Sequence, residues 1–193
     1  MAVKPVFTLE GDKELIKALR DLSGAQVDKA IGMGFRRTKT ATKGYIAKAV
    51  SQNYAIKQKD VKDSIVRETI KTSPPAELKF FGSTKPISMR KFRVSMGVRW
   101  VNRANVRVSF FKGKKTEISR GWRWETFASG NPFAREGDSR TPIRKIHGIS
   151  FHHLFTGGRR ARRMRAEVER KAMPRLTTEV KQALRAVSRG YVR

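Results

Sequence analysis

Three histidines, His147, His152 and His153, are the only imidazole groups of the chain. Histidine is the commonest metal ligand and the usual acid–base group near neutral pH. The run before the adjacent pair, Ile143 to Ile149, has the composition of a strand, and neighbouring side chains of a strand point to opposite faces. A metal site would need carboxylates from elsewhere. Packing and hydrogen-bonding roles are therefore favoured, and no metal is expected.

The acidic side chains are too scattered to predict a metal-dependent nuclease. Hydrolysis with two metal ions needs several carboxylates that converge on one site. From Glu77 onward the predicted sheet region offers only Glu77, Glu117 and Glu125, and Glu136 and Asp138 fall in a predicted loop. The acidic residues of the helical stretches mostly lie beside lysine or arginine, where surface ion pairs are expected.

Motifs for nucleotide or thiol chemistry are missing from the sequence. There is no cysteine, which excludes disulfides, thiolate metal sites and cysteine nucleophiles together. No phosphate-binding loop of the type G-x-x-x-x-G-K-[ST] occurs, and Gly157 and Gly158 followed by arginine are too short to specify a nucleotide site. We therefore expect no catalytic residue and no cofactor, and a protein that is not an enzyme.

Basic residues form the stronger pattern. The segment from Arg159 to Arg165 follows two glycines, and its arginines can reach phosphates or carboxylates in forked geometry. A merely solvated helix is the alternative, and the charge of the whole chain favours contact with a partner. The residues predicted to contact DNA or an acidic partner are Arg36, Arg37, Lys39, Lys43, Arg159, Arg160, Arg162, Arg163 and Arg165.

Tryptophans lie among arginines in the middle of the chain. Trp100, Trp122 and Trp124 alternate with cations in a way that suits stacking on the bases of single-stranded nucleic acid. In a strand, however, Trp122 and Trp124 share one face, which is more typical of a core or a subunit contact. The predicted subunit contacts are Trp122 and Trp124 together with two small residues of an early helix, Gly34 and Ala41.

The net charge of the chain points to a negative partner. In 193 residues, 44 lysines and arginines stand against 16 acidic residues, for a formal charge of +28. Such an excess repels itself in a compact monomer and attracts polyanions. Neither a signal peptide nor a membrane span is expected from the distribution of apolar residues, so we predict a soluble protein made in the cytoplasm.

The elements that position these residues follow from hydrophobic period and breakers. Helices are predicted over Asp12 to Leu22, Gln26 to Ser51 and Ile56 to Ile65, with apolar residues at three- and four-residue spacing. Strands are predicted at Val66 to Thr72, Glu77 to Phe81, Phe92 to Val98, Ala104 to Phe111, Gly121 to Phe127 and Ile143 to Ile149. Loops are predicted over 84–105 and 130–142.

Helical period returns after Arg159, and Pro174 predicts the start of a new helix because proline suits a first turn better than a helix interior. The order of helices, sheet and helices predicts an α+β fold with one long helix and a central, mainly antiparallel sheet. We expect a core domain over residues 1–158 and a basic helical segment over 159–193, packed on that domain or extending from it.

The order of several segments resembles the minor tail protein Z family, the tail-completion proteins of long-tailed bacteriophages. The resemblance spans about residues 25 to 190, and Gly82 to Asn102 and Asn131 to Thr141 fit it less clearly, so no loop contacts are carried over. It lies in VDKAIGMGFRRTKTATKGYIAKAV, IKQKDVKDSIVRETIK, NVRVSFFKGKK, GWRWETF and MPRLTTEVKQALRAV.

The resemblance implies a virion component at the head-proximal end of the tail, needed for tail maturation and for joining the tail to a DNA-filled head. It also implies a homo-oligomeric ring, with a hexamer expected and a dodecamer as the alternative. The implied partners are a tail terminator and a head–tail connector, with contact to DNA in the lumen as a further expectation.

Two other functions stay open from the residues. A nucleic-acid-binding protein without sequence preference, associated with ribosomes or the nucleoid, would account for the same charge. An enzyme acting on nucleic acid is a minor alternative that a screen for metal dependence would address. Charge alone does not separate the structural protein from the nucleic-acid-binding protein.

Overall fold

The computed structural model describes residues 7–10, 24–73, 75–95, 106–118, 121–123, 132–135, 143–145 and 147–188. Its helices are α2 (Gly24–Asn53), α3 (Gln58–Asp63), the short 3-10 helix η1 (Met89–Lys91), α4 (Phe151–Thr156) and α5 (Gly158–Ser188). Its strands are β1 (Phe7–Glu10), β2 (Ile65–Lys71), β3 (Glu77–Gly82), β4 (Pro86–Ser88), β5 (Arg93–Ser95), β6 (Val106–Phe111), β7 (Lys114–Ile118), β8 (Gly121–Arg123), β9 (Pro132–Arg135), β10 (Ile143–Lys145) and β11 (His147–Ser150).

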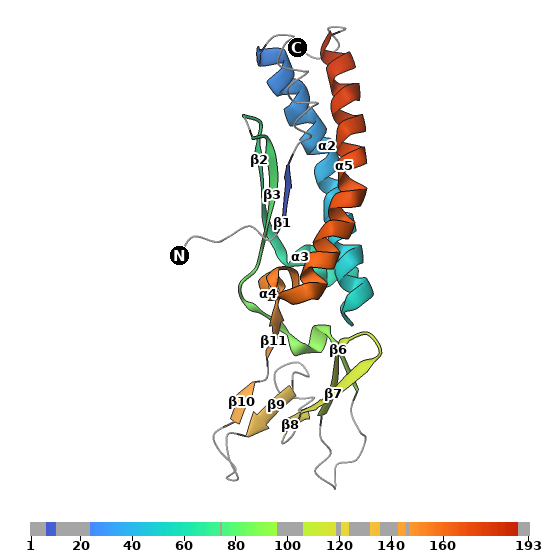
Figure 1. Ribbon diagram of the computed structural model, residues 1–193. Helices are drawn as coiled ribbons and strands as arrows, with labels where there is room; N and C mark the ends of the chain where they lie inside the picture. The colour runs from blue at the N-terminus through green and yellow to red at the C-terminus, as the bar shows by residue number, and fades with distance from the viewer. Residues whose placement is uncertain are drawn as a thin grey trace.

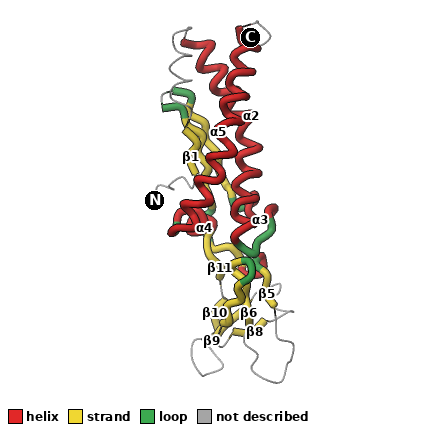
Figure 2. Tube along the Cα trace, turned by 45° about the vertical axis from the view of Figure 1, so that its right-hand side comes forward, coloured by secondary structure: helices red, strands yellow, loops and turns green. Residues whose placement is uncertain are grey.

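Two long helices, α2 and α5, lie side by side and run in opposite directions along the molecule (Figures 1 and 2). The apolar stripe predicted for the early helix is the buried face of α2, with Ile31, Phe35 and Ile46 almost fully inaccessible. On α5, Met164 and Val168 join the same hydrophobic core. Because each helix has only one apolar face, the pairing removes both faces from water at once.

Helix α5 is continuous, so the helix break predicted at Pro174 is wrong. Proline in a helix interior removes one backbone hydrogen bond and costs about 3 kcal/mol. Here Pro174 is exposed, whereas Ala172 and Leu176 on either side of it are buried. Burial of apolar residues both before and after the proline holds the two halves in one line, and tertiary packing thus outweighs the local cost.

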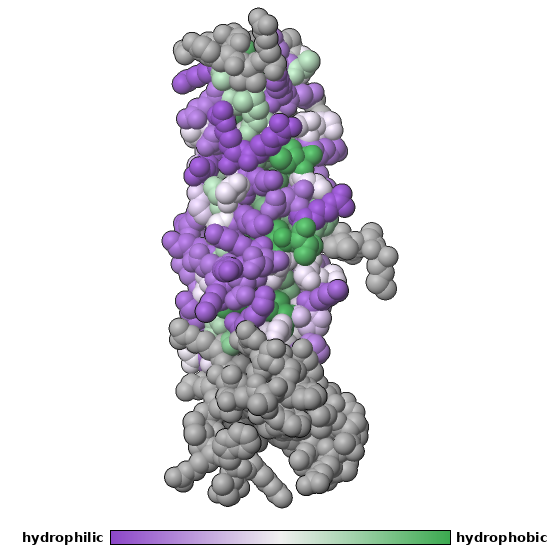
Figure 3. All heavy atoms as spheres, turned by 180° about the vertical axis from the view of Figure 1, so that it is seen from behind, coloured by the Kyte–Doolittle hydropathy of each residue, from purple (hydrophilic) through white to green (hydrophobic). Residues whose placement is uncertain are grey.

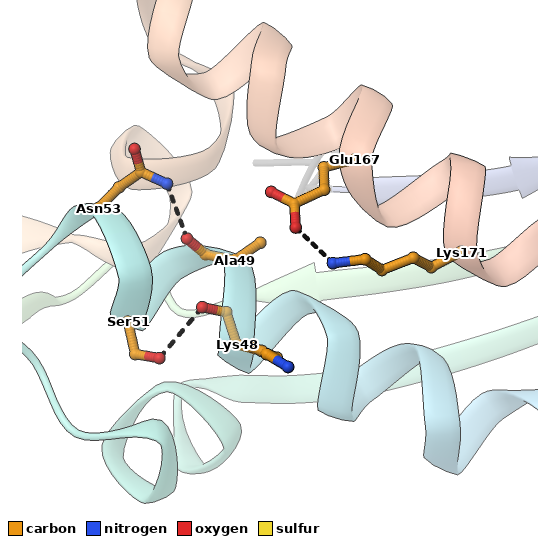
Figure 4. Close-up of polar contacts among 6 residues, drawn as sticks. All are labelled: Lys48, Ala49, Ser51, Asn53, Glu167 and Lys171. Atoms are coloured by element: carbon orange, nitrogen blue, oxygen red, sulfur yellow. Dashed lines mark hydrogen bonds and ion pairs between the residues drawn. The ribbon is translucent and has the colours of Figure 1, made fainter.

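Two side chains in the last turn of α2 donate to backbone carbonyls of the same helix (Figure 4). The Asn53 amide nitrogen donates to the Ala49 carbonyl at 2.9 Å, and the Ser51 hydroxyl donates to the Lys48 carbonyl at 3.1 Å. The Tyr54 amide donates to the Val50 carbonyl at 2.8 Å, so the backbone bonding continues to the end of α2 and the two side-chain bonds add to it. Figure 4 also shows the ion pair between Lys171 and Glu167 on α5.

A three-stranded antiparallel sheet in the order β1-β3-β2 lies beside the helix pair (Figure 1). In its central strand β3, Leu78 and Phe80 are buried and alternate with half-buried Glu77, Lys79 and Phe81. This alternation is the pattern expected of a sheet with one face on the core. The predicted strands Val66 to Thr72 and Glu77 to Phe81 thus correspond to β2 and β3.

Three smaller antiparallel sheets form the other end of the molecule, in the orders β5-β6-β7, β10-β9-β8 and β11-β4. The predicted central sheet is therefore divided into several small sheets. Parts of the predicted strands at Phe92 to Val98, Ala104 to Phe111, Gly121 to Phe127 and Ile143 to Ile149 are found in β5, β6, β8, β10 and β11.

Two segments predicted as loops contain regular structure. Residues 84–105 include β4, η1 and β5, and Ile87, Met89 and Phe92 of this segment are buried in the core. Residues 130–142 include β9. These segments are rich in serine, glycine and charged residues, which predicts loops. Their few apolar residues become buried only because the segments pair with strands that are distant in the sequence.

Some helix predictions also change. The third helix is shorter than predicted, because Ile56 forms a bridge with Phe92 and Ile65 already belongs to β2. His152 and His153 lie on helix α4, and the extended run ends at Ser150 before them. The helix predicted over Asp12 to Leu22 lies outside the described residues.

The fold class is confirmed as α+β, with one long early helix, antiparallel sheets and helices at the C-terminal end. The predicted boundary at 158/159 falls at the start of α5. Buried residues of α5 belong to the same hydrophobic core as those of α2 and β3. The basic segment therefore packs on the preceding residues along its length.

Candidate polyanion-binding surface

Lys39 and Lys43, predicted as partner contacts, form ion pairs inside the chain. Both ammonium groups lie 3.2 Å from the carboxylate oxygens of Glu68 on β2. Burial raises the pKa of Glu68, but hydrogen bonds and charge from the two lysines outweigh it, so the pKa is lowered. These lysines tie α2 to the sheet, and part of their charge is already neutralised.

Arg37 is also paired within the chain, whereas no described carboxylate pairs with Arg36. The Arg37 guanidinium lies 3.8 Å from Glu179 of α5, which also accepts Arg175 at 3.7 Å. Both arginine side chains are about half exposed, so the pairs contribute little stability. Arg36 is exposed and has no carboxylate partner among the described residues.

The arginines at the start of α5 have no carboxylate partner among the described residues. Arg159, Arg162 and Arg163 are exposed and, within the described part of the chain, pair with no carboxylate; Arg165 is half-buried. The first turn of α5 contains no acidic residue. A helix N-terminus also has a partial positive charge from its backbone dipoles, so the potential of the arginines and of the helix adds.

Arg160 is held against an aromatic ring. Its guanidinium carbon lies 4.1 Å from the centroid of Phe111, within the range of a cation–π contact. The Phe111 ring in turn packs on Tyr54 at a centroid distance of 5.2 Å. Burial raises the pKa of the Tyr54 hydroxyl, and the charge of Arg160 opposes this rise. Arg160 nevertheless stays exposed to solvent.

The same contact brings the turn between β6 and β7 next to α5. Tyr54 and Phe111 form a bridge, and the Lys112 amide donates to the Asn53 carbonyl at 3.3 Å. Figure 1 shows β6 and β7 meeting the end of the helix pair. Exposed Lys112 and Lys114 flank Gly113, which has φ 77°, a backbone conformation that favours glycine.

We name five exposed cations, from the β6–β7 turn and from the start of α5 that contacts it, the junction patch: Lys112, Lys114, Arg159, Arg160 and Arg163. Lys112 and Lys114 were missing from the predicted contacts. Their lysine-rich turn was visible in the sequence, but its position beside α5 depends on the Arg160–Phe111 contact between residues far apart in the chain.

The four predicted subunit contacts lie in different environments. Gly34 is buried against Val180 of α5, so the close approach predicted from small residues takes place within the chain and Gly34 is not available to a second subunit. Ala41 is half-buried. Trp122 lies on β8, opposite Phe133 of β9 in the register, and Trp124 lies outside the described residues.

The histidines serve local structure. Ser150 caps α4 by accepting the His153 amide at 3.3 Å, and its hydroxyl lies 2.7 Å from His153 Nδ1. The described residues contain no group of three or more histidine or acidic side chains that could hold a metal ion.

The surface seen in Figure 3 is largely hydrophilic over the helix pair, as expected from the outward cations. No helix within the described ranges is long and apolar enough to span a membrane. Comparisons of the chain with protein-family models, with curated proteins and with solved structures found no match.

Proposed function

We propose that the protein is a structural, non-enzymatic subunit of a bacteriophage neck or tail. In this proposal it forms a homo-oligomeric ring, a hexamer or a dodecamer, at the head-proximal end of the tail. It completes the tail so that the tail can join a DNA-filled head. Its partners would be a tail terminator and a head–tail connector, and it would enter the virion from the host cytoplasm.

The observation that carries the proposal is the uncompensated charge at the start of α5. Arg159, Arg162 and Arg163 stand together at the positive end of a long helix, and the described residues offer them no carboxylate. Like charges held this close destabilise an isolated chain, and a negative partner relieves the repulsion. A subunit of a permanent assembly around DNA meets such a partner.

The order of elements supports the phage assignment. The segments that resemble the tail-completion family include most of α2, the region of α3 and β2, strand β6 with its turn, and the second half of α5. A stiff pair of long helices with cations on the outside suits a subunit that transmits contacts between neighbours in a ring.

The experiment is to remove the protein from phage assembly and to examine its association with tails. Without it, we expect DNA-filled heads and free tails that do not join, and added purified protein should restore joining. Mass photometry and cryo-EM of the protein with tail tubes should show a ring at one end of the tube. Joined particles formed without the protein would overturn the proposal.

A nucleic-acid-binding protein outside the virion is the second candidate, favoured by the same exposed arginines. It predicts that the protein binds naked DNA or RNA in a salt-sensitive way and is absent from finished particles. Mass spectrometry of purified virions separates the two candidates, because only the structural subunit stays in the particle.

A further inference from the structure

We infer that the junction patch binds the phosphate backbone of nucleic acid, without reading its sequence. The inference deepens the proposed function and rests on it, since a subunit on the path of DNA would present this patch to the duplex. The patch is the set Lys112, Lys114, Arg159, Arg160 and Arg163 defined above.

The first argument is the separation of two kinds of cation. Lys39 and Lys43 share Glu68, and Arg37 faces Glu179, so these predicted contacts are already engaged. The junction patch has no carboxylate partner in the described portion of the chain. An external anion interacts most favourably with cations that have no carboxylate partner in the protein.

The second argument is that the patch lacks what a protein partner needs. Protein interfaces usually have an apolar centre and are depleted in lysine. The one large exposed hydrophobic side chain of the described residues, Val66, lies on β2, outside the patch. Phe111 is covered by Arg160. Phosphate contacts require no apolar centre, and interfaces with DNA are strongly positive and polar.

The third argument concerns specificity. Single-stranded nucleic acid is held by aromatic rings on which bases stack. The Phe111 ring has one face occupied by the Arg160 guanidinium, and it also packs on Tyr54. The groups available to nucleic acid are therefore cations that contact the phosphate backbone. Such contacts do not depend on the base sequence.

The fourth argument is preorganisation. Arg159 and Arg163 stand one helical turn apart on α5, about 6 Å between Cβ atoms, so their side chains are neighbours on the helix surface. Arg160 is oriented by its ring contact, which reduces the entropy lost when its fork binds an anion. The patch is thus built on a helix and on a hairpin rather than on isolated side chains.

The test is binding of the full chain to a short DNA duplex of arbitrary sequence at several salt concentrations. Each phosphate contact contributes about 0.9 to the slope of log K against log salt, so Arg159→Gln/Arg163→Gln should reduce the slope by about 1.8. The matched control is Arg170→Gln/Lys181→Gln, which removes the same charge from exposed positions of the same helix. The control should keep the slope of the unmodified chain.

Equal slope losses in both variants would overturn the inference, because they would show a response to total charge alone. More effective competition by polyglutamate than by DNA at equal charge would also overturn it, in favour of an acidic protein. Circular dichroism checks that both variants fold. Head–tail joining is measured in a separate assay. If the protein is needed for joining but Arg159→Gln/Arg163→Gln leaves the salt slope of DNA binding unchanged, only this inference is overturned and the proposed function stands.

Discussion

Gly34 on α2 and Val180 on α5 lie so close that a Cβ atom on Gly34 would be 2.3 Å from Val180 Cγ2 and 3.1 Å from the Val180 backbone. The glycine is thus required by the spacing of the two helices. The contact shows that the small-residue stripe of α2 is covered by α5, a helix of the same chain.

Gly34→Ala should destabilise the protein by about 1–3 kcal/mol, because the added methyl group forces the helices apart. Gly44→Ala is the matched control on the same helix. No atom lies within 4 Å of a Cβ at Gly44, and removing a helical glycine there should stabilise by up to about 1 kcal/mol. Urea unfolding measures both changes. A neutral Gly34→Ala would contradict the close packing.

Thr38→Val and Thr42→Val should each stabilise the protein by about 1 kcal/mol. Both hydroxyl oxygens are fully buried and have no hydrogen-bond partner among the described residues, and a buried polar group without a partner costs free energy. Thr40→Val, at an exposed position of α2, should change stability by less than about 0.5 kcal/mol. Lower melting temperatures of the Thr38 and Thr42 variants would show that the hydroxyls are satisfied.

Glu68→Gln should lower the free energy of unfolding by about 0.5–1 kcal/mol at neutral pH. The variant should also lose less stability than the unmodified chain as the pH falls. The pKa of Glu68 is lower in the folded chain than the ordinary value of 4.5. Its stabilisation is therefore complete above the ordinary pKa and is lost as the pH falls through the folded pKa. Urea unfolding between neutral and acid pH measures the effect.

Lys39→Gln/Lys43→Gln tests the cause of this pH dependence. Without the lysines only burial acts on Glu68, and burial raises its pKa. The contribution of Glu68 should then change sign, so that protonation of Glu68 favours folding. An unchanged acid dependence in this variant would mean that the two lysines do not hold Glu68.

Pro174→Ala should stabilise the protein by about 1–3 kcal/mol, since α5 is continuous through Pro174 and the proline is exposed. The helical signal in circular dichroism should be retained or should rise. Pro174→Gly restores the backbone amide but lacks the helix propensity of alanine, so it should stabilise less. Destabilisation by alanine would indicate that the helix is interrupted at this position.

Much of the fold follows from local pattern. The three- and four-residue spacing of Val27, Ala30, Gly34 and Thr38, continued along the same stripe to Ala49, predicts α2 within two residues at each end. The β-rich runs predict β2, β3 and β6. The predictions fail at Pro174 and over 84–105, where contacts with distant segments outweigh the breakers and the polar residues nearby.

The candidate site is predicted only in part. The arginines after Gly158 are recognisable from composition, and the structure leaves Arg159, Arg162 and Arg163 exposed. Composition does not distinguish them from Lys39 and Lys43, which have the same charge but face Glu68. Whether a cation is paired depends on a carboxylate from another element.

The amino-acid sequence by itself determined the positive charge, the amphipathic helix α2, the helical period after Arg159 and the scarcity of catalytic groups, because these are properties of residue type and short spacing. Only the tertiary structure decided that α5 covers Gly34, that Glu68 engages Lys39 and Lys43, and that Lys112 and Lys114 join the arginines of α5. The physical reason is that periodicity defines which face of a helix is apolar or charged, whereas the partner of that face comes from segments far away in the chain.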